Sequence, residues 1–450
     1  LPRLVWLGST LSLPTDLLIW SEPPLLLNLW KIRAGEAFYG PFTRLNSYSY
    51  SPALEHFQYA LLRPLGLELS LVAHRALGVA WQLLAALCLT AGVARHLDRR
   101  RSAWLALGVT CVGALFSSLL APHLHPDHLL MLCLSGAFWL VMRNESHAAP
   151  SRIWLALLVA LPVLATMVKL TGAGIGLGLG LAYLWERDLR RIGYLALSGM
   201  LAVATIWLFD AVFGHFSDYA LRLQASHPLD VERTLAAWST PPVLLCTVAA
   251  LVTAWRYRSV RSSPAARAAI RVLLVTAGIG LTSLLAYAKH GGRENSLLPF
   301  ALGGLVALVL SLSASSEQSE SRTLPSAVYV ALAASLALVT PMARPVLGEG
   351  RADVRLMHQN VVGWLSESAR QHHRVFATST AAYLAAGWPD VPDTSLATLA
   401  ELELAKRPEV APFAERVQAR YYDGLVLPAS TLRLSPLFQR LLPSLQANYR

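Results

Sequence analysis

Long apolar runs recur along the whole chain and are separated by shorter polar segments. A helix that crosses the hydrocarbon core of a bilayer needs about 17 to 25 mostly apolar residues. The pattern therefore predicts roughly eleven membrane-spanning helices, and the short first run indicates a truncated first helix. The runs lie near residues 1–14, 68–94, 103–121, 127–142, 153–168, 171–185, 192–213, 241–255, 271–288, 296–314 and 324–343.

Arginine clusters in alternate connections between these runs, at 95–101, 143–152, 187–191 and 256–271. Short loops rich in basic residues stay on the cytoplasmic side of a membrane. The other connections, and everything after about residue 344, are therefore expected on the external side. The first external segment departs from this rule because it also carries basic residues, which favours a site for an anion there.

That first external segment, Thr15 to Gly66, is too long for a simple turn between two helices. Its carboxylates, basic residues and aromatic rings are interleaved with glycine and proline, as in a working loop held at the bilayer surface. Its charged and aromatic residues are Asp16, Glu22, Glu36, Glu55, Lys31, Arg33, Arg44, Arg63, Phe38, Tyr39, Phe42, Tyr48 and Tyr50.

The last part of the chain, residues 344–450, has a lower density of apolar residues and more proline, aspartate and glutamate. Its pattern predicts a strand at 374–378, helices at 379–386, 395–406 and 409–421, a strand at 424–427 and a helix at 435–446. This order predicts a small external α/β domain with a parallel pair of strands. Residues 1–343 would form the transmembrane domain, so the predicted fold is a mainly α polytopic bundle with this domain attached.

The composition agrees with a membrane protein, since 54% of the residues are hydrophobic and 14% are charged, against about 25% charged in soluble domains. The net charge of +11 follows largely from the arginine-rich loops, so it gives no reason to expect nucleic acid as a partner. The four cysteines lie inside apolar runs and are expected as core residues without a disulfide framework.

Three carboxylates on the external side are candidate catalytic groups. Glu22 and Asp16 lie beside an apolar run, where burial raises a carboxyl pKa and suits it to act as a general base. Asp127 begins a predicted helix directly after Pro126. Each has a structural alternative, because Glu22 could be a solvated residue at the membrane surface and the two aspartates could cap helices.

The run from His123 to His128 contains three histidines and one aspartate. Imidazole and carboxylate groups bind divalent metals, so His125 and Asp127 are candidate ligands. The spacing matches no standard zinc pattern, and capping of the following helix explains Asp127 equally well.

Two cationic groups are candidate binding sites for a phosphate. Lys169 ends an apolar run and is followed by a glycine-rich one, where a lysine either reaches to the membrane surface or meets an anion. The glycines between 172 and 180 indicate close helix packing. The external connection 289–295 is the second group, with Lys289, His290, Arg293 and Asn295 beside two glycines. An ordinary polar turn is its structural alternative.

The order of these motifs resembles the multispanning C-type glycosyltransferases (GT-C fold), a family that includes bacterial protein mannosyltransferases and lipid A aminoarabinose transferases. Ser21 stands where the family has the first of two acidic residues, so only Glu22 remains of that pair. The resembling stretches are Trp20-Ser21-Glu22, Ala34-Gly35-Glu36-Ala37-Phe38-Tyr39, Tyr50-Ser51-Pro52, Pro126-Asp127, Val168-Lys169-Leu170-Thr171-Gly172 and the segment from Lys289 to Asn295.

The resemblance implies a hexosyl- or pentosyltransferase of a bacterial inner membrane that uses a polyprenyl-phosphate-linked sugar. Lys169, Lys289, His290 and Arg293 would bind the donor phosphate, and Glu22, with Asp16 or Asp127, would act on the acceptor. Tyr39, Tyr50 and Asn295 would line the acceptor side, and the acceptor would be a glycan, lipid or protein. The competing interpretations are a lipid or polysaccharide transporter and a non-catalytic envelope assembly protein.

Overall fold

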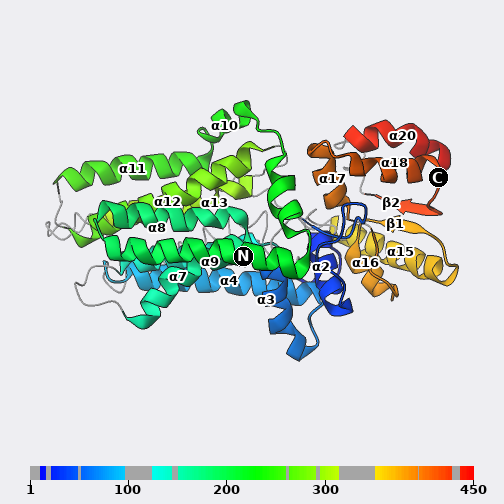
Figure 1. The fold of residues 1–450 in the computed structure, drawn as a ribbon, viewed down its shortest axis with the longest axis horizontal. Coiled ribbons are helices and arrows are strands. Elements are labelled where there is room, and N and C mark those ends of the chain that lie inside the picture. Colours follow the sequence, from blue (N-terminus) through cyan, green and yellow to red (C-terminus); the bar gives the residue numbers. More distant parts are fainter. Residues whose placement is uncertain are drawn as a thin grey trace.

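The structure of the chain is a computed structural model. It describes residues 11–16, 22–48, 52–96, 124–143, 151–259, 263–289, 294–313, 350–393, 395–427 and 436–449. A bundle of helices occupies one end of the long axis and the C-terminal segment the other (Figure 1). The two parts meet near helix α2 (Glu22–Ala34), which belongs to the segment Thr15–Gly66.

Eight of the predicted apolar runs are helices of the bundle. The runs at 103–121 and 324–343, and most of the first run, lie outside the described residues. The eight helices are α4 (Leu71–Val93), α6 (Asp127–Met142), α7 (Arg152–Val168), α8 (Ala173–Trp185), α9 (Leu189–Phe213), α11 (Pro241–Ser259), α12 (Pro264–Ala288) and α13 (Leu298–Ser313).

Within the described part of the chain, four helices are long and apolar enough to cross a membrane: α4, α9, α12 and the run Asn295–Ser313 that includes α13. A fifth span results if α10 (Val231–Ala237) and α11, which meet at a bend of 52°, count as one. Helices α6, α7 and α8 are apolar but shorter. The described residues therefore hold fewer full-length spans than the roughly eleven predicted.

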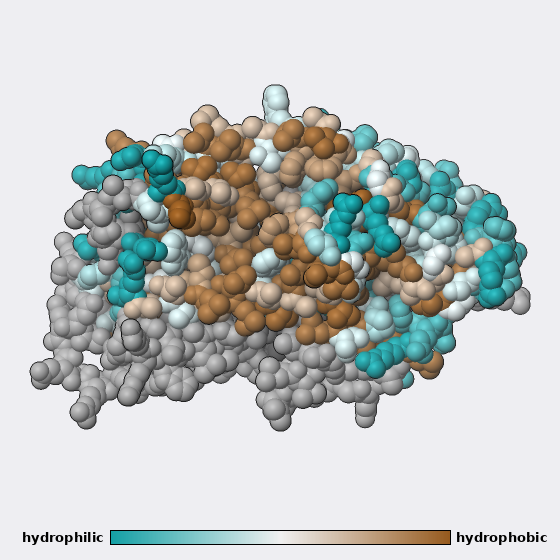
Figure 2. All heavy atoms as spheres, turned by 90° about the horizontal axis from the view of Figure 1, so that it is seen from below, coloured by the Kyte–Doolittle hydropathy of each residue, from teal (hydrophilic) through white to brown (hydrophobic). Residues whose placement is uncertain are grey.

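The surface of the molecule has the distribution that a bilayer requires. Figure 2 shows a broad apolar band across the middle, with hydrophilic residues gathered towards both ends. Helix α9 contributes to this apolar surface, because Ser198 is its one buried residue and Trp207 is 76% exposed. Such a helix is stable only against lipid or another apolar surface. The chain is a multi-pass membrane protein.

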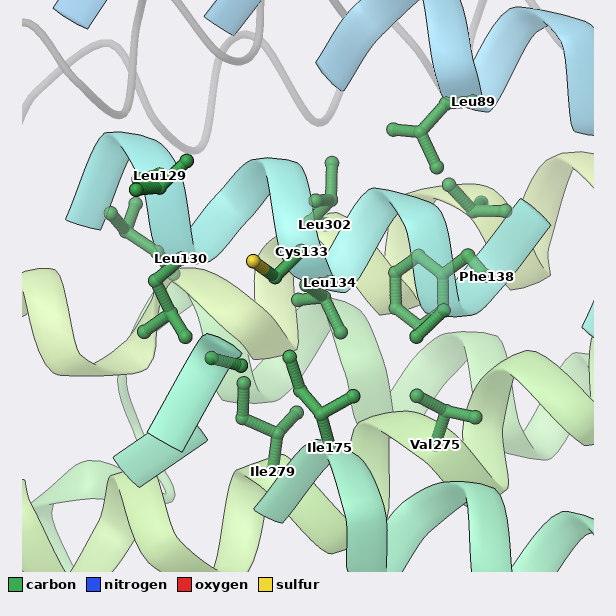
Figure 3. Close-up of a cluster of buried hydrophobic side chains, with 14 of the residues drawn as sticks. Leu89, Leu129, Leu130, Cys133, Leu134, Phe138, Ile175, Val275, Ile279 and Leu302 are labelled. Carbon is green, nitrogen blue, oxygen red and sulfur yellow. The ribbon is translucent and has the colours of Figure 1, made fainter. Parts of the chain in front are cut away.

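The core of the bundle is built by α6, α8, α12 and α13. Leu134 and Phe138 of α6 face Ile175 of α8 and Ile279 of α12 in a dry apolar cluster (Figure 3). Helices α8 and α12 approach so closely that a Cβ on Gly278 would lie 2.2 Å from the backbone nitrogen of Gly178. The prediction that the glycines of this region serve helix packing is confirmed at this position.

The prediction that the cysteines are core residues is confirmed for Cys133, whereas Cys88 and Cys246 are partly exposed. Cys88, Cys133 and Cys246 are free thiols, and Cys133 lies in the bundle core. Cys111 lies outside the described residues.

The described residues of the segment Thr15–Gly66 include two helices. Helix α2 is followed by Gly35, whose positive φ of 70° ends the helix in the left-handed conformation that glycine tolerates best. Helix α3 (Ala53–Leu62) continues into a short 3-10 turn, Arg63–Leu65, before α4. Gly35 and Gly66, both with positive φ, therefore end α2 and the 3-10 turn that follows α3.

The C-terminal segment has the order of elements that the sequence predicts. Strands β1 (Val375–Ala377) and β2 (Gly424–Val426) pair in parallel, with Phe376 opposite Leu425. Between them lie α16 (Thr380–Ala385), α17 (Leu396–Leu404) and α18 (Ala411–Gln418), and α20 (Pro436–Asn448) follows. Helix α15 (Gly350–Arg370), which precedes β1, was not predicted from the sequence pattern. The predicted boundary near residue 344 lies outside the described residues.

Candidate functional site

Asp127 is the centre of a polar cluster at one end of the bundle. It is the first residue of α6 and is only 3% exposed. Lys169 Nζ donates to Asp127 Oδ1 at 2.7 Å, and Asn295 Nδ2 donates to Asp127 Oδ2 at 2.6 Å. Three segments that lie far apart in the sequence therefore converge on one carboxylate.

The chain positions Lys169 by a tight turn between α7 and α8. Lys169 leaves α7 with an extended backbone, and the 3-10 turn Leu170–Gly172 leads directly into α8. Gly172 is required there, because a Cβ on it would lie 2.2 Å from the carbonyl oxygen of Ala165. This turn places the Lys169 ammonium at a helix end, as the sequence predicts, and its partner is a buried carboxylate.

The predicted metal ligands are in contact with each other. His125 Nδ1 lies 3.2 Å from Asp127 Oδ2. Across the described residues, however, no group of three or more His, Cys, Asp or Glu side chains is placed to hold a metal ion. His123 lies outside the described residues, so the metal site stays a prediction that rests on His125 and Asp127.

Glu22 forms a buried ion pair with Arg75 of α4. Arg75 Nε donates to Glu22 Oε1 at 2.8 Å and Arg75 Nη2 donates to Glu22 Oε2 at 2.6 Å. The backbone N–H of Leu124 also donates to Glu22 Oε1, at 2.8 Å. Both side chains are fully buried. The pair joins the start of α2, the first turns of α4 and the segment that leads to Asp127.

Arg75 also holds the chain that precedes α2. Its Nη1 donates to the carbonyl of Leu13 at 2.7 Å, and its Nη2 donates to the carbonyl of Thr15 at 2.8 Å. Arg75 was not among the candidate residues predicted from the sequence. An arginine inside an apolar run was the available signal, because a charge at membrane depth requires a partner.

Asp16 connects the first external segment to the C-terminal segment. Its Oδ1 accepts from the Ser379 hydroxyl at 2.6 Å, and its Oδ2 accepts from the backbone N–H of Ala381 at 2.9 Å, at the start of α16. Burial raises the pKa of Asp16 to about 6, although both hydrogen bonds lower it and Glu22 raises it further. The contact agrees with the alternative that Asp16 caps a helix. The helix that it caps, α16, lies far from Asp16 in the sequence.

The cationic connection after α12 is described only at its two ends. Lys289 Nζ donates to the carbonyl of Gln224 at 2.6 Å, whereas Asn295 reaches Asp127. His290 and Arg293 lie between them and outside the described residues, as does Tyr50. Lys289 and Asn295 are six residues apart, so their backbones are at most about 20 Å apart.

Tyr39, a predicted acceptor residue, is buried in an aromatic cluster. Its ring stacks on Tyr219 at 5.2 Å between centroids and also contacts Phe38. Burial raises the pKa of the Tyr39 hydroxyl well above its usual value. Nearby, Lys31 Nζ donates to the Phe38 carbonyl at 2.6 Å and to Ser47 Oγ at 2.8 Å. These contacts fix the shape of the loop between α2 and α3.

The fold of the chain is similar to that of a solved aminoarabinose transferase. The structure of ArnT, an aminoarabinose transferase, from Cupriavidus metallidurans in the apo state has a TM-score of 0.53 at 15% identity, covering 96% of this chain and 92% of that chain. The same protein bound to undecaprenyl phosphate has a TM-score of 0.49 at 15% identity, covering 99% and 86%. No protein-family model matches the chain, and no curated protein matches its sequence. The likeness establishes a shared fold.

Proposed function

We propose that the chain is an integral-membrane glycosyltransferase that moves a sugar from a polyprenyl-phosphate donor to an acceptor on the external face. The observation that carries the proposal is the convergence of Asp127, Lys169 and Asn295 at one end of a bundle with the ArnT fold. Transfer from a lipid phosphate requires cations to neutralise the departing phosphate, and both lysines of the candidate site lie at helix ends.

The sidedness of the site supports this reaction. Asp127 begins α6 and Arg143 follows its end, so the cluster lies at the opposite end of this helix from a basic residue. Arg256 and Arg258 likewise lie in the last turn of α11. By the positive-inside rule, the Asp127 end of the bundle is external. We place the protein in a bacterial inner membrane, with residues 344–450 as a small periplasmic domain.

The donor phosphate would bind between Lys169, Lys289 and Arg293, with His290 beside them. The Lys169 ammonium is shared with Asp127 in the present structure, so a phosphate would join an existing ion pair instead of meeting a free lysine. Asn295 and Asp127 would then orient the sugar. The acceptor would approach along the first external loop, near Tyr39 and Tyr50.

Asp16 fits the role of general base better than Glu22. A base works best when its pKa is near the working pH, and burial raises the pKa of Asp16 to about 6. Both Glu22 oxygens already accept hydrogen bonds from Arg75, and Oε1 also accepts from the Leu124 N–H, so this carboxylate is occupied in holding the chain together. In this assignment Asp16 takes the role of the first acidic residue of the family pattern, whose position is occupied by Ser21 in this chain. Glu22 anchors the loop.

A turnover assay with radiolabelled polyprenyl-phosphate sugars and purified full-length protein tests the function. We expect sugar transfer by the wild type and a loss of about 100-fold or more for Asp127→Asn. Asp353→Asn, which changes an exposed carboxylate on α15, is the matched control and should keep full activity. Movement of lipid without sugar transfer would instead identify a transporter, and neither activity would indicate an assembly protein.

A further inference from the structure

A second polar cluster lies where the C-terminal segment meets the bundle. Glu401 belongs to α17, and Gln224 and His227 follow the π-helix Asp218–Leu223. Gln224 Nε2 donates to Glu401 Oε2 at 2.7 Å, and His227 Nε2 lies 3.3 Å from the same oxygen. Lys289 Nζ donates to the backbone carbonyl of Gln224. Gln224 thus connects a carboxylate of the C-terminal segment to a lysine of the candidate donor site.

The backbone of Lys289 is held independently of this cluster. Asp230 N–H donates to the carbonyl of Ala288 at 2.7 Å, Leu229 forms an antiparallel bridge with Lys289, and Arg233 Nη1 donates to the Lys289 carbonyl at 3.2 Å. The ammonium itself is held more loosely. Of its three N–H donors, the described residues engage one. The end of α12 is therefore fixed, and the ammonium retains donors for a ligand.

The charges of Glu401 and Lys289 act on each other. Burial raises the pKa of Glu401 to about 7, while the Gln224 hydrogen bond and the Lys289 charge lower it. Burial lowers the pKa of Lys289, and the Glu401 charge raises it. Among the described residues, the ionisable side chains that contact this pair are His227, beside Glu401, and Arg233, at the Lys289 carbonyl. Lys169 differs, because its carboxylate partner Asp127 is in direct contact.

We propose that Glu401 is a positioning residue for Lys289, holding its ammonium through Gln224 at the outer end of α12 in competition with the donor phosphate. The proposal rests on the proposed function, since it deepens the account of the same donor site. When phosphate binds, the ammonium turns from the C-terminal segment to the phosphate, and a charged Glu401 then lies near a second anion. Donor binding and protonation of Glu401 therefore favour each other.

The pairing is testable without any donor, because lysine occurs at only four positions of the sequence, 31, 169, 289 and 406. Amine labelling of the full-length protein across pH, read by mass spectrometry at each lysine, gives the apparent pKa of Lys289. Glu401→Gln removes the counter-charge, so we expect that pKa to fall by about 0.5–1 unit. Exposed Lys406 is the internal control and should not change. An unchanged Lys289 titration would overturn the pairing.

The matched control variant is Glu403→Gln. Glu403 lies on the same helix, two residues from Glu401, and its carboxylate lies 3.7 Å from Arg440. We expect this variant to leave the Lys289 titration at its wild-type position. A shift equal to that of Glu401→Gln would mean that general disturbance of α17 causes the effect, and would overturn the specific role of Glu401.

Binding of undecaprenyl phosphate to the purified proteins tests the competition. Glu401 is largely protonated at pH 5.5, so wild type and Glu401→Gln should bind equally there. At pH 7.5 the variant should bind about two- to fourfold more tightly, because the wild-type carboxylate must first be neutralised. At a given pH the lipid phosphate is ionised to the same extent with both proteins, so its ionisation does not change the ratio of the two affinities. Equal affinities at both pH values would overturn the competition, whereas no binding by either protein, with the Lys289 shift present, would count against the donor class alone.

Discussion

The core of the bundle and the junction formed by Glu22, Arg75, Asp16 and Ser379 are stabilised by different interactions. In the core, apolar side chains of α6, α8 and α12 pack without polar partners, and glycines let two backbones touch. At the junction, buried charges are satisfied by partners far away in the sequence, as in the pair Glu22–Arg75. The stability of the core depends on how completely apolar side chains fill the available volume. The stability of the junction depends on whether each buried charged group keeps its partner. The junction should therefore respond more severely to the loss of single groups.

Loss of Arg75 should have the largest effect. Arg75→Met leaves the fully buried Glu22 carboxylate without its cation and releases the carbonyls of Leu13 and Thr15. Breaking a buried ion pair from one side costs about 3–5 kcal/mol. We expect a strongly lowered thermal unfolding midpoint in detergent. The double variant Arg75→Met/Glu22→Met, which has no charge left to satisfy, should recover much of the loss, and its failure to do so would contradict the ion-pair explanation.

Replacement of Asp16 and replacement of Glu22 should lower the rate of sugar transfer to different extents. Asp16→Asn removes the proposed base, so sugar transfer should fall by about 100-fold while donor binding is retained. In the wild type, kcat/KM should rise with pH through the Asp16 pKa of about 6, because the base acts when deprotonated, and the variant should lack this rise. Glu22→Gln, measured per folded molecule, should lose less. A larger loss in Glu22→Gln, with Asp16→Asn near wild type, would return the base role to Glu22.

A single methyl group tests the core. In Gly178→Ala the new Cβ would lie 2.4 Å from the backbone oxygen of Val275, so α8 and α12 must separate. Overpacking of this kind costs about 1–3 kcal/mol. Gly180 on the same helix has nothing within 4 Å of its Cβ position, and Gly180→Ala should be neutral or slightly stabilising. Equal unfolding midpoints for the two variants would show that this helix contact does not limit stability.

Glu55 should give the smallest effect. Burial raises its pKa from the ordinary 4.5 to about 8, although a hydrogen bond from Asn28 lowers it. The folded protein therefore holds this proton more tightly than the unfolded chain, and stability present below pH 4.5 is lost as pH rises through about 8. Glu55→Gln removes this loss. At pH 8.5 the variant should unfold about 2–4 °C above the wild type, and at pH 4.5 the two should coincide.

Much of the fold was predictable because it depends on local periodicity. The strand, helix, strand and helix order of the C-terminal segment follows from patterns a few residues long, and the observed β1–β2 pair is parallel as predicted. Helix ends were less accurate. Helix α12 begins at Pro264, ahead of the predicted 271, because its first two turns, which include Arg267, precede the long apolar run. Helix α15 was missed because it is polar and lies outside any apolar run.

The candidate site was predictable in its residues more than in its contacts. The sequence singled out Asp127, Lys169 and Asn295 separately, and the structure brings them together. It could not reveal that Arg75 engages Glu22 or that Ser379 engages Asp16, because such pairs depend on how distant segments pack. The sequence placed Lys169 and Lys289 in one phosphate site, and the structure shows different partners for each. Their joint role stays a prediction.

The contact between Asp16 and Ser379 has a consequence for the order in which the protein is made. The two residues are separated by 363 positions, so at about 5–20 residues per second a ribosome needs about 20 to 70 s to supply the partner. During that time Asp16 has left the ribosome, but α16 does not yet exist. The contact between these two segments is therefore completed only when translation is nearly finished, so the part of the chain around Asp16 must fold without this partner for most of synthesis.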